Sequence, residues 1–200
     1  MDLDFTKEER RMLQRLNTPD KIQEFINNNL QYDFEENGET FSPFRDVIRK
    51  RKAHCLEGAL FACGTLYYHG YPPRIVCMEA RDIDHNIAIY RINGCWGSVA
   101  QSRDENLKGR EARFRSIKDL VMSYYPYYWD FFSKDQDKTN LTMRGYATIN
   151  LNTVDISWIF SEKGVVRVVN LLWGAKYRFL FPNGSKFYKV DKKTNKLIFL

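Results

Sequence analysis

The sequence predicts an α+β fold in which N-terminal helices and a central buried helix pack against an antiparallel sheet, followed by a β-rich C-terminal extension. Residues 55–69 are almost continuously apolar, which is typical of a buried helix, and Gly70 stands where a left-handed residue is expected to end it. Residues 74–102 contain three short β-rich runs, RIVCMEA, HNIAIYRI and CWGSVAQS. The last two runs are joined by Asn93-Gly94, which favours a tight hairpin turn because both of its central residues need positive φ.

Three helix starts are expected before the central helix. Thr6 and Glu9 have the spacing of a capping box, in which each side chain bonds the backbone N–H of the other residue. Thr18-Pro19 supplies an N-cap residue and a proline at the first helical position, and Ser42-Pro43 repeats this pattern. These short helices are expected to cover the central helix.

The second half of the chain is expected to contain one more helix and then strands. A helix begins at Ser116 and breaks near Pro126, because proline cannot donate a helical hydrogen bond. The C-terminal extension, residues 131–200, has three runs that are expected to be strands, VVRVVNLLWGAKYRFLFP, KFYKV and KLIFL, with turns at Asn183-Gly184 and Thr194-Asn195. No linker-like stretch divides the chain, so we interpret residues 1–200 as a single domain.

The composition is typical of a water-soluble globular protein. Of the 200 residues, 44% are apolar, 15% are aromatic and 28% are charged, which argues against a disordered chain. No segment approaches the roughly 18 apolar residues that a membrane-spanning helix needs, and the N-terminal segment lacks the apolar core of an export signal. We therefore expect a cytoplasmic protein with no membrane partner.

Charge and cysteine content argue against two further classes. The 31 basic residues are balanced by 25 acidic residues, and no nucleic-acid-binding motif is present, so nucleic-acid binding is disfavoured. The four cysteines include no C-x-x-C pair, so neither a disulfide framework nor a zinc site is expected. A metal site built from Cys55, His54, His85 and Cys95 would lack the usual ligand spacing. We expect no metal and no cofactor.

The chemical centre of the sequence is Cys55, at the first turn of the predicted central helix. Unpaired backbone N–H groups and the positive end of the helix dipole favour a thiolate there, and a full shift of the pKa also needs a cationic partner. We set His54 aside because adjacent helical residues point about 100° apart. His69 lies at the far end of the same helix. His85, at the start of the first hairpin strand, is therefore the predicted partner.

This order of residues resembles the core of the transglutaminase-like group in the papain-like cysteine-protease superfamily. The resemblance covers roughly residues 18–125 and rests on Cys55, His85, the Asn93-Gly94 turn and Trp96 beyond it. It implies a transglutaminase-like core. It also implies a cysteine hydrolase or acyltransferase that acts on an amide or peptide substrate through a Cys-His dyad.

One position departs from the family pattern. The family's aspartate, four residues beyond the tryptophan, is replaced by Ala100, which cannot orient an imidazole. The hairpin register predicts Ser102 opposite His85, so Ser102 is the preferred substitute, with Gln101 next and Asp104 as a loop residue that folds back. A neutral group stabilises an imidazolium less than a carboxylate does. The alternative is therefore a catalytically weak or inactive binding module of the same fold.

Two aromatic residues complete the predicted site. Trp96 is expected either to pack in the sheet or to shape the oxyanion site as well. Tyr125 belongs to an aromatic cluster, residues 124–129, that is expected either to line a substrate groove or to pack in the core. We take both as candidate substrate-binding residues.

Overall fold

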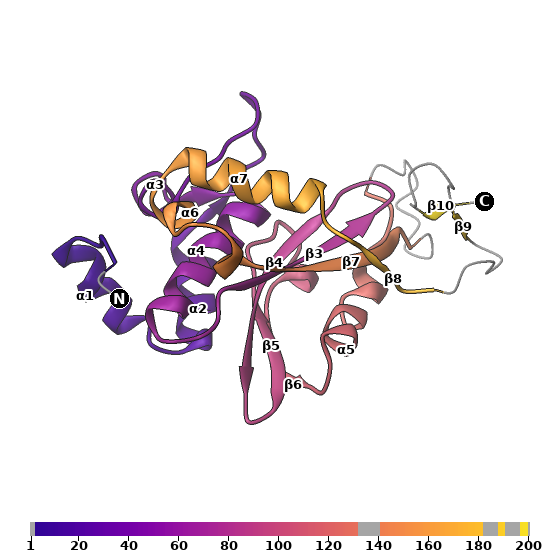
Figure 1. Ribbon diagram of the computed structural model, residues 1–200, viewed down its shortest axis with the longest axis horizontal. Helices are drawn as coiled ribbons and strands as arrows, with labels where there is room; N and C mark the ends of the chain where they lie inside the picture. Colours follow the sequence, from indigo (N-terminus) through magenta and orange to yellow (C-terminus); the bar gives the residue numbers. More distant parts are fainter. Residues whose placement is uncertain (1–2, 132–140, 182–187, 191–196, 200) are drawn as a thin grey trace.

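The computed structural model describes residues 3–131, 141–181, 188–190 and 197–199. Its centre is a six-stranded sheet in the order β6-β5-β4-β3-β7-β8, in which every neighbouring pair is antiparallel (Figure 1). The strands span Arg74–Ala80 (β3), His85–Ile92 (β4), Cys95–Val99 (β5), Arg110–Phe114 (β6), Met143–Asn150 (β7) and Arg178–Phe179 (β8). The predicted α+β class is therefore confirmed.

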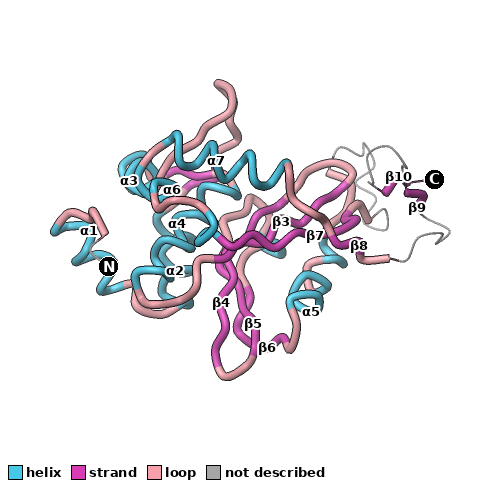
Figure 2. The backbone as a smooth tube through the Cα atoms, viewed as in Figure 1, coloured by secondary structure: helices cyan, strands magenta, loops and turns pink. Residues whose placement is uncertain are grey.

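Seven α-helices lie within the described residues. They span Lys7–Arg15 (α1), Pro19–Asn29 (α2), Phe44–Lys50 (α3), Cys55–Tyr68 (α4), Ile117–Met122 (α5), Ser157–Phe160 (α6) and Glu162–Trp173 (α7). Figure 2 shows α1 to α4, α6 and α7 gathered on one side of the sheet, with α5 apart from them. No helix of the described part is long and apolar enough to cross a membrane.

Two buried apolar clusters cover the two faces of the sheet. Alternate residues of a strand point to opposite faces. In β3, Ile75 and Cys77 pack with α4 and the other N-terminal helices, whereas Val76 and Met78 pack with α5. Helix α4 is thus enclosed between the sheet and its helical neighbours, as the apolar run predicted.

The helix signals near the N-terminus are confirmed at α1 and α2 and are partly wrong at α3. Thr6 and Glu9 form a complete capping box on α1. Thr18 caps α2, and Pro19 is its first residue. Helix α3 begins at Phe44 without a side-chain cap, because the residue before it is Pro43 and not the predicted serine.

The predicted hairpin is present in the predicted register. Asn93 and Gly94 have φ values of 50° and 80°, as a tight turn of this type requires. Ile92 pairs with Cys95, and the ladder continues to Ala88, which pairs with Val99. The β4–β5 ladder ends there, three residues short of His85.

The C-terminal half contains the largest differences from prediction. Helix α7 occupies the first half of a run that was expected to be a strand, because Val165, Val168 and Leu172 recur at helical spacing and are buried on one face. Strand β7, which no pattern predicted, pairs with β3 and places Met143–Asn150 inside the sheet. The helix that begins after Ser116 ends earlier than expected, at Met122.

The last predicted strands have counterparts at Tyr188–Val190 (β9) and Leu197–Phe199 (β10), which pair with each other in an antiparallel ladder. The turns expected at Asn183-Gly184 and Thr194-Asn195 lie outside the described residues.

Candidate active site

The nucleophile candidate Cys55 is the first residue of α4, as predicted. Its side chain is half-buried and its thiol is free. Three polar side chains lie near the sulfur. The imidazoles of His54 and His85 both lower the pKa of the thiol, and the Nδ2 atom of Asn86 lies 3.8 Å from Sγ. The first residue of a buried helix is therefore surrounded by polar groups, which is an unusual environment for a structural cysteine.

The imidazole of His85 is held in one orientation by the backbone. Its Nε2 atom lies 2.8 Å from the main-chain oxygen of Leu107. A carbonyl oxygen can only accept, so Nε2 carries the proton of this bond. In the neutral ring the other nitrogen, Nδ1, then has a free lone pair for the proton of Cys55. His85 is 4% exposed, so this bond is shielded from water.

The group that orients His85 is not one of the residues expected from the hairpin register. The Ser102 hydroxyl accepts a hydrogen bond from the main-chain N–H of Asp104. The Gln101 side chain donates to the main-chain oxygen of Leu30 and accepts from the N–H of Ser102. The chain leaves the ladder at Val99, and the loop beyond it returns to His85 through a backbone carbonyl.

A short 3-10 helix, η1 (Glu105–Leu107), positions that carbonyl. Asp104 caps it, because its Oδ1 atom accepts a hydrogen bond of 2.8 Å from the N–H of Asn106. The N–H of Leu107 also bonds the main-chain oxygen of Asp104. Asp104 thus acts on His85 through the loop that holds Leu107. Asp104 was predicted from the sequence as a loop residue that folds back toward His85, but its role as the cap of η1 was not predicted.

A second imidazole, that of His54, which was set aside on sequence grounds, also lowers the pKa of the Cys55 thiol. His54 is the N-cap of α4 and has extended backbone angles, φ −81° and ψ −178°. It therefore does not follow the helical rotation of 100° per residue that was used to exclude it. Its Nε2 atom lies 3.1 Å from the main-chain oxygen of Thr40, and its Nδ1 atom accepts from the N–H of Leu56 at 3.3 Å.

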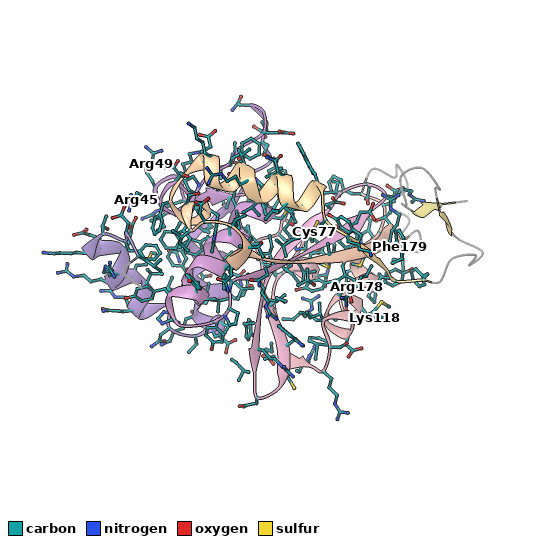
Figure 3. All side chains as sticks on the ribbon, in the orientation of Figure 1. Arg45, Arg49, Cys77, Lys118, Arg178 and Phe179 are labelled. Carbon is teal, nitrogen blue, oxygen red and sulfur yellow. The ribbon has the colours of Figure 1, made fainter. Side chains whose placement is uncertain are left out.

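The surroundings of Cys55 favour the thiolate. Burial of the sulfur raises the pKa of the Cys55 thiol, but the hydrogen bonds and charges of His54 and His85 outweigh burial and hold the pKa well below its ordinary value. By contrast, burial raises the pKa of the Cys63 and Cys77 thiols, which pack as apolar groups in the core. Figure 3 shows Cys77 within the sheet. The pKa of Cys55 is thus shifted in the opposite direction to the pKa values of Cys63 and Cys77.

Tyr32 stands at the main-chain N–H of Cys55. The short strand β1 (Gln31–Tyr32) pairs in parallel with β2 (Lys52–Ala53), which directly precedes the N-cap of α4, so Tyr32 lies beside the start of the helix. Burial raises the pKa of Tyr32 and the charge of Cys55 adds to this, whereas a hydrogen bond from the Cys55 N–H opposes it. Tyr32 therefore lies close to Cys55.

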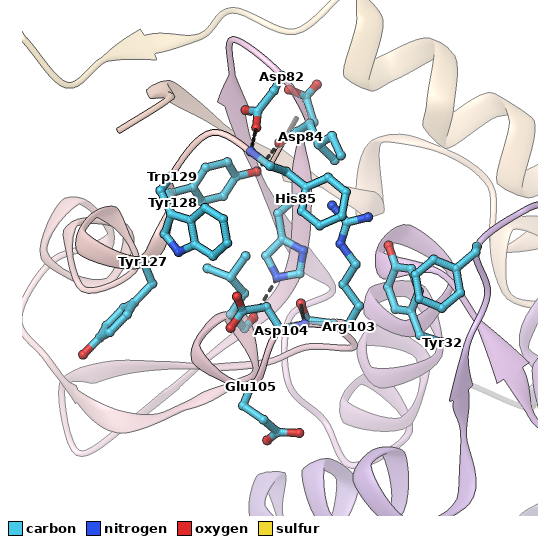
Figure 4. A pocket seen from close by; sticks show the side chains of 15 residues that line it. Tyr32, Asp82, Asp84, His85, Arg103, Asp104, Glu105, Tyr127, Tyr128 and Trp129 are labelled. Carbon is cyan, nitrogen blue, oxygen red and sulfur yellow. Dashed lines mark hydrogen bonds between the residues drawn. The ribbon is translucent and has the colours of Figure 1, made fainter. Parts of the chain in front are cut away.

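A cavity of about 610 Å³ opens beside His85. Figure 4 shows His85 between Tyr32 on one side and Tyr127, Tyr128 and Trp129 on the other. Charged side chains also border the cavity, and the guanidinium of Arg103 lies over the ring of Phe131. The other lining residues are Phe34, Asp82, Ile83, Asp84, Ser102, Asp104, Glu105 and Leu107. The cavity is thus aromatic along its walls and charged along parts of its border.

Neither predicted substrate-binding aromatic residue lines this cavity. Trp96 lies in β5 near the guanidinium groups of Arg74 and Arg91. Tyr125 packs edge-on against Phe181, with ring centroids 5.3 Å apart. Three members of the same aromatic cluster, residues 127–129, line the cavity instead. The cluster was located from the sequence, but the sequence did not show which of its members line the cavity.

No group of three or more histidine, cysteine or acidic side chains arranged to hold a metal ion occurs among the described residues.

No protein-family model matches this chain, and the curated proteins include no match to it. The site is therefore interpreted from its own geometry.

Proposed function

We propose that the protein is a cysteine-dependent hydrolase or acyltransferase that acts on an amide or peptide bond through Cys55 and His85. The observation that carries this proposal is the sulfur of Cys55 at the start of α4, 3.8 Å from Asn86 at the start of β4, together with the adjacent His85, whose imidazole lowers the pKa of the thiol and whose Nε2 atom is fixed on a carbonyl. This pairing of nucleophile, base and orienting group supports acyl-transfer chemistry. The order of α4, β4 and β5 agrees with a transglutaminase-like core, which remains part of the proposal.

The first half-reaction follows from these contacts. The Cys55 thiolate attacks the carbonyl carbon of the amide, and a C–S bond forms as the oxygen becomes negative. The N–H of Cys55 is the proposed donor to this oxygen. When the C–N bond breaks, the leaving amine takes the proton that His85 holds on Nδ1. A thioester on Cys55 remains.

The second half-reaction returns the enzyme to its starting state. Water or an amine attacks the thioester, and the Nδ1 atom of His85 accepts the proton that the nucleophile loses. The C–S bond breaks, and Cys55 leaves as the thiolate. Since Nε2 keeps its proton on the Leu107 carbonyl throughout, only Nδ1 exchanges protons.

A weak or inactive binding module is the second candidate. It is favoured by Ala100 at the position of the family's aspartate and by the neutral carbonyl that bonds His85 instead. A carbonyl orients the ring but stabilises its charged form less than a carboxylate does. This candidate keeps the cavity as a binding site and predicts no acyl-enzyme.

An acylation experiment separates the two candidates. The protein is incubated with p-nitrophenyl acetate, and the modified residue is located by mass spectrometry. We expect one acetyl group on Cys55, released over time, and none in Cys55→Ala. Cys95→Ala is the matched control, because Cys95 is also half-buried but lies in the hairpin. Absence of acetyl-Cys55 in the unmodified protein would contradict catalysis and leave the binding module.

A further inference from the structure

Asn86 is a buried amide in an otherwise apolar stretch of β4. It is 7% exposed, and the four residues that follow it, 87–90, are also buried. Its partner across the ladder is Cys77 of β3, which packs in the core with α4. Because cross-strand partners lie on the same face of a sheet, Asn86 also lies on the α4 face. Buried strand positions favour β-branched and aromatic residues, so the sheet itself does not call for an amide here.

Only one end of the Asn86 side chain is hydrogen-bonded. Its Nδ2 atom lies 3.8 Å from Sγ of Cys55, whereas its Oδ1 atom is buried and has no hydrogen-bond partner among the described residues. Burying a polar atom without a partner destabilises a folded protein. The stability of the fold therefore does not explain Asn86, whose amide instead contacts the nucleophile.

The sulfur determines which end of the amide faces it. A thiolate accepts hydrogen bonds and cannot donate them, and the oxygen of an amide also only accepts, so Nδ2 is the atom that faces Sγ. Sulfur is a weak acceptor. The N–H group of Asn86 thus points at the reacting atom of Cys55 while it is bonded to a poor acceptor.

Attack on a carbonyl brings a better acceptor within reach of this N–H group. Once the C–S bond has formed, the carbonyl oxygen of the substrate is two bonds from the sulfur, which is closer to Sγ than Nδ2 is. A donor at 3.8 Å from Sγ can therefore reach that oxygen at the roughly 2.7–3.1 Å of a good oxyanion contact. Negative charge leaves the sulfur for the oxygen in the same step, so the hydrogen bond becomes stronger as the reaction proceeds.

We propose that Asn86 is a catalytic residue whose Nδ2–H group donates to the oxyanion of the tetrahedral intermediate, beside the main-chain N–H of Cys55. The inference rests on the proposed function of Cys55 and His85. As the C–S bond forms, the π electrons of the C=O bond move to the oxygen, which accepts hydrogen bonds from both donors. When the C–N bond breaks, the same electrons form the C=O bond of the thioester. Asn86 neither gains nor loses a proton, so His85 still holds the proton that passes to the leaving amine.

Two reactions of Cys55 separate an oxyanion donor from a group that only contacts the sulfur. Acetylation by p-nitrophenyl acetate passes through an oxyanion, whereas alkylation by iodoacetamide displaces iodide and forms none. Each rate is measured at the pH where it has levelled off, so that the fraction of thiolate does not enter the comparison. The variant is Asn86→Leu, which keeps the branched shape of the side chain and removes both of its polar atoms.

We expect acetylation of Cys55 to slow by about 100-fold or more in Asn86→Leu, with alkylation within about threefold of the unmodified protein. The free energy of unfolding in urea should stay equal or rise, because the variant removes a buried oxygen that has no partner among the described residues. Equal losses in the two rates, or no loss of acetylation, would overturn the inference.

Thr65→Val is the matched control. Thr65 is also buried, and its hydroxyl donates to the main-chain oxygen of Phe61 within α4. The substitution likewise replaces a buried polar side chain with an apolar one of similar shape, ten positions away from Cys55. We expect it to leave both rates unchanged, and a loss of acetylation as large as that of Asn86→Leu would count against a specific role of Asn86.

A measurement on the unmodified protein covers the case in which Asn86→Leu does not fold. Propionaldehyde adds to Cys55 as a hemithioacetal: the S–H bond breaks, a C–S bond forms, and the carbonyl oxygen takes up the proton. By ¹⁵N NMR, we expect one Nδ2 proton of Asn86 to shift downfield and to exchange more slowly with water, because the new oxygen accepts from it. An adduct that leaves the exchange of both Nδ2 protons unchanged would overturn the inference.

The outcomes distinguish this inference from the proposed function. If Cys55 of the unmodified protein is alkylated but never acetylated, the proposed function fails and the inference fails with it. If Cys55 is acetylated at the same rate in Asn86→Leu and in the unmodified protein, the inference alone is wrong.

Discussion

The Nε2 atom of His85 lies 2.8 Å from the main-chain oxygen of Leu107, a residue 22 positions further along the chain. The loop that follows β5 thereby supplies the orienting group that the hairpin itself lacks at Ala100. A backbone carbonyl fixes the tautomer of the ring and adds no negative charge. The geometry of a catalytic imidazole is thus present with a weaker electrostatic partner than a carboxylate.

The first prediction concerns Asp104, the positioning residue for this carbonyl. Asp104→Ala removes the cap of η1 and should let the Leu107 oxygen move away from His85. We expect release of the acetyl group from Cys55 to slow by about tenfold or more. Asp104→Asn is the control, because asparagine also caps. Equal rates for Asp104→Ala and the unmodified protein would mean that the cap does not support the site.

The second prediction concerns the close packing of Gly58, in α4, against Gln101. A Cβ atom on Gly58 would clash with the Cβ of Gln101, whereas a Cβ atom on Gly64 would make only ordinary contacts at 3.6 Å or more. We expect Gly58→Ala to lower the free energy of unfolding by about 1–3 kcal/mol through overpacking. Gly64→Ala, on the same helix, should be neutral or stabilising by up to about 1 kcal/mol. Urea unfolding of both variants checks this, and equal effects would contradict it.

The third prediction is a pH dependence of stability. Burial raises the pKa of Glu9, but two hydrogen bonds from Arg45, at 2.7 and 3.0 Å, and the N–H of Thr6 lower it below 4.5 overall. The stabilising contribution is therefore present above pH 4.5 and is lost as the pH falls through the lowered value in the folded protein.

The variant Glu9→Gln tests this dependence. We expect it to lose about 1 kcal/mol of unfolding free energy at pH 7 and to differ less from the unmodified protein as the pH falls below 4. Asp46→Asn, which removes the more exposed pair with Arg49, should cost about 0.5 kcal/mol or less. A constant difference between Glu9→Gln and the unmodified protein from pH 7 to 3 would show that the Glu9 charge does not contribute.

Local signals in the sequence were sufficient for the elements that build the nucleophile's surroundings. Capping residues, the apolar run of α4 and the Asn93-Gly94 turn depend on neighbours in sequence, and the structure confirms them. Strand β7 escaped prediction because its pairing with β3 joins segments about 70 residues apart. Helix α7 was misread because its valines favour strands locally, while burial of one helical face decides the outcome.

The same division applies to the candidate site. Cys55 and His85 were predicted from residue type and position in the sequence, and in the structure the imidazole of His85 lowers the pKa of the Cys55 thiol. The Leu107 carbonyl was not found, since a main-chain atom leaves no trace in residue type. His54 was excluded on a helical geometry that an extended N-cap residue does not have. Ser102 and Gln101 were placed by extending a ladder that ends at Val99. The transglutaminase-like family and a cytoplasmic location stay predictions.

The measurement that tests the central claim most directly is the rate of alkylation of Cys55 by iodoacetamide between pH 5 and 10, with the modified residue located by mass spectrometry. The account predicts that the rate has already reached its plateau near neutral pH, with an apparent thiol pKa below about 7. A rate that rises with a midpoint near 8.5, the value of an ordinary thiol, would contradict a thiolate held by His54 and His85.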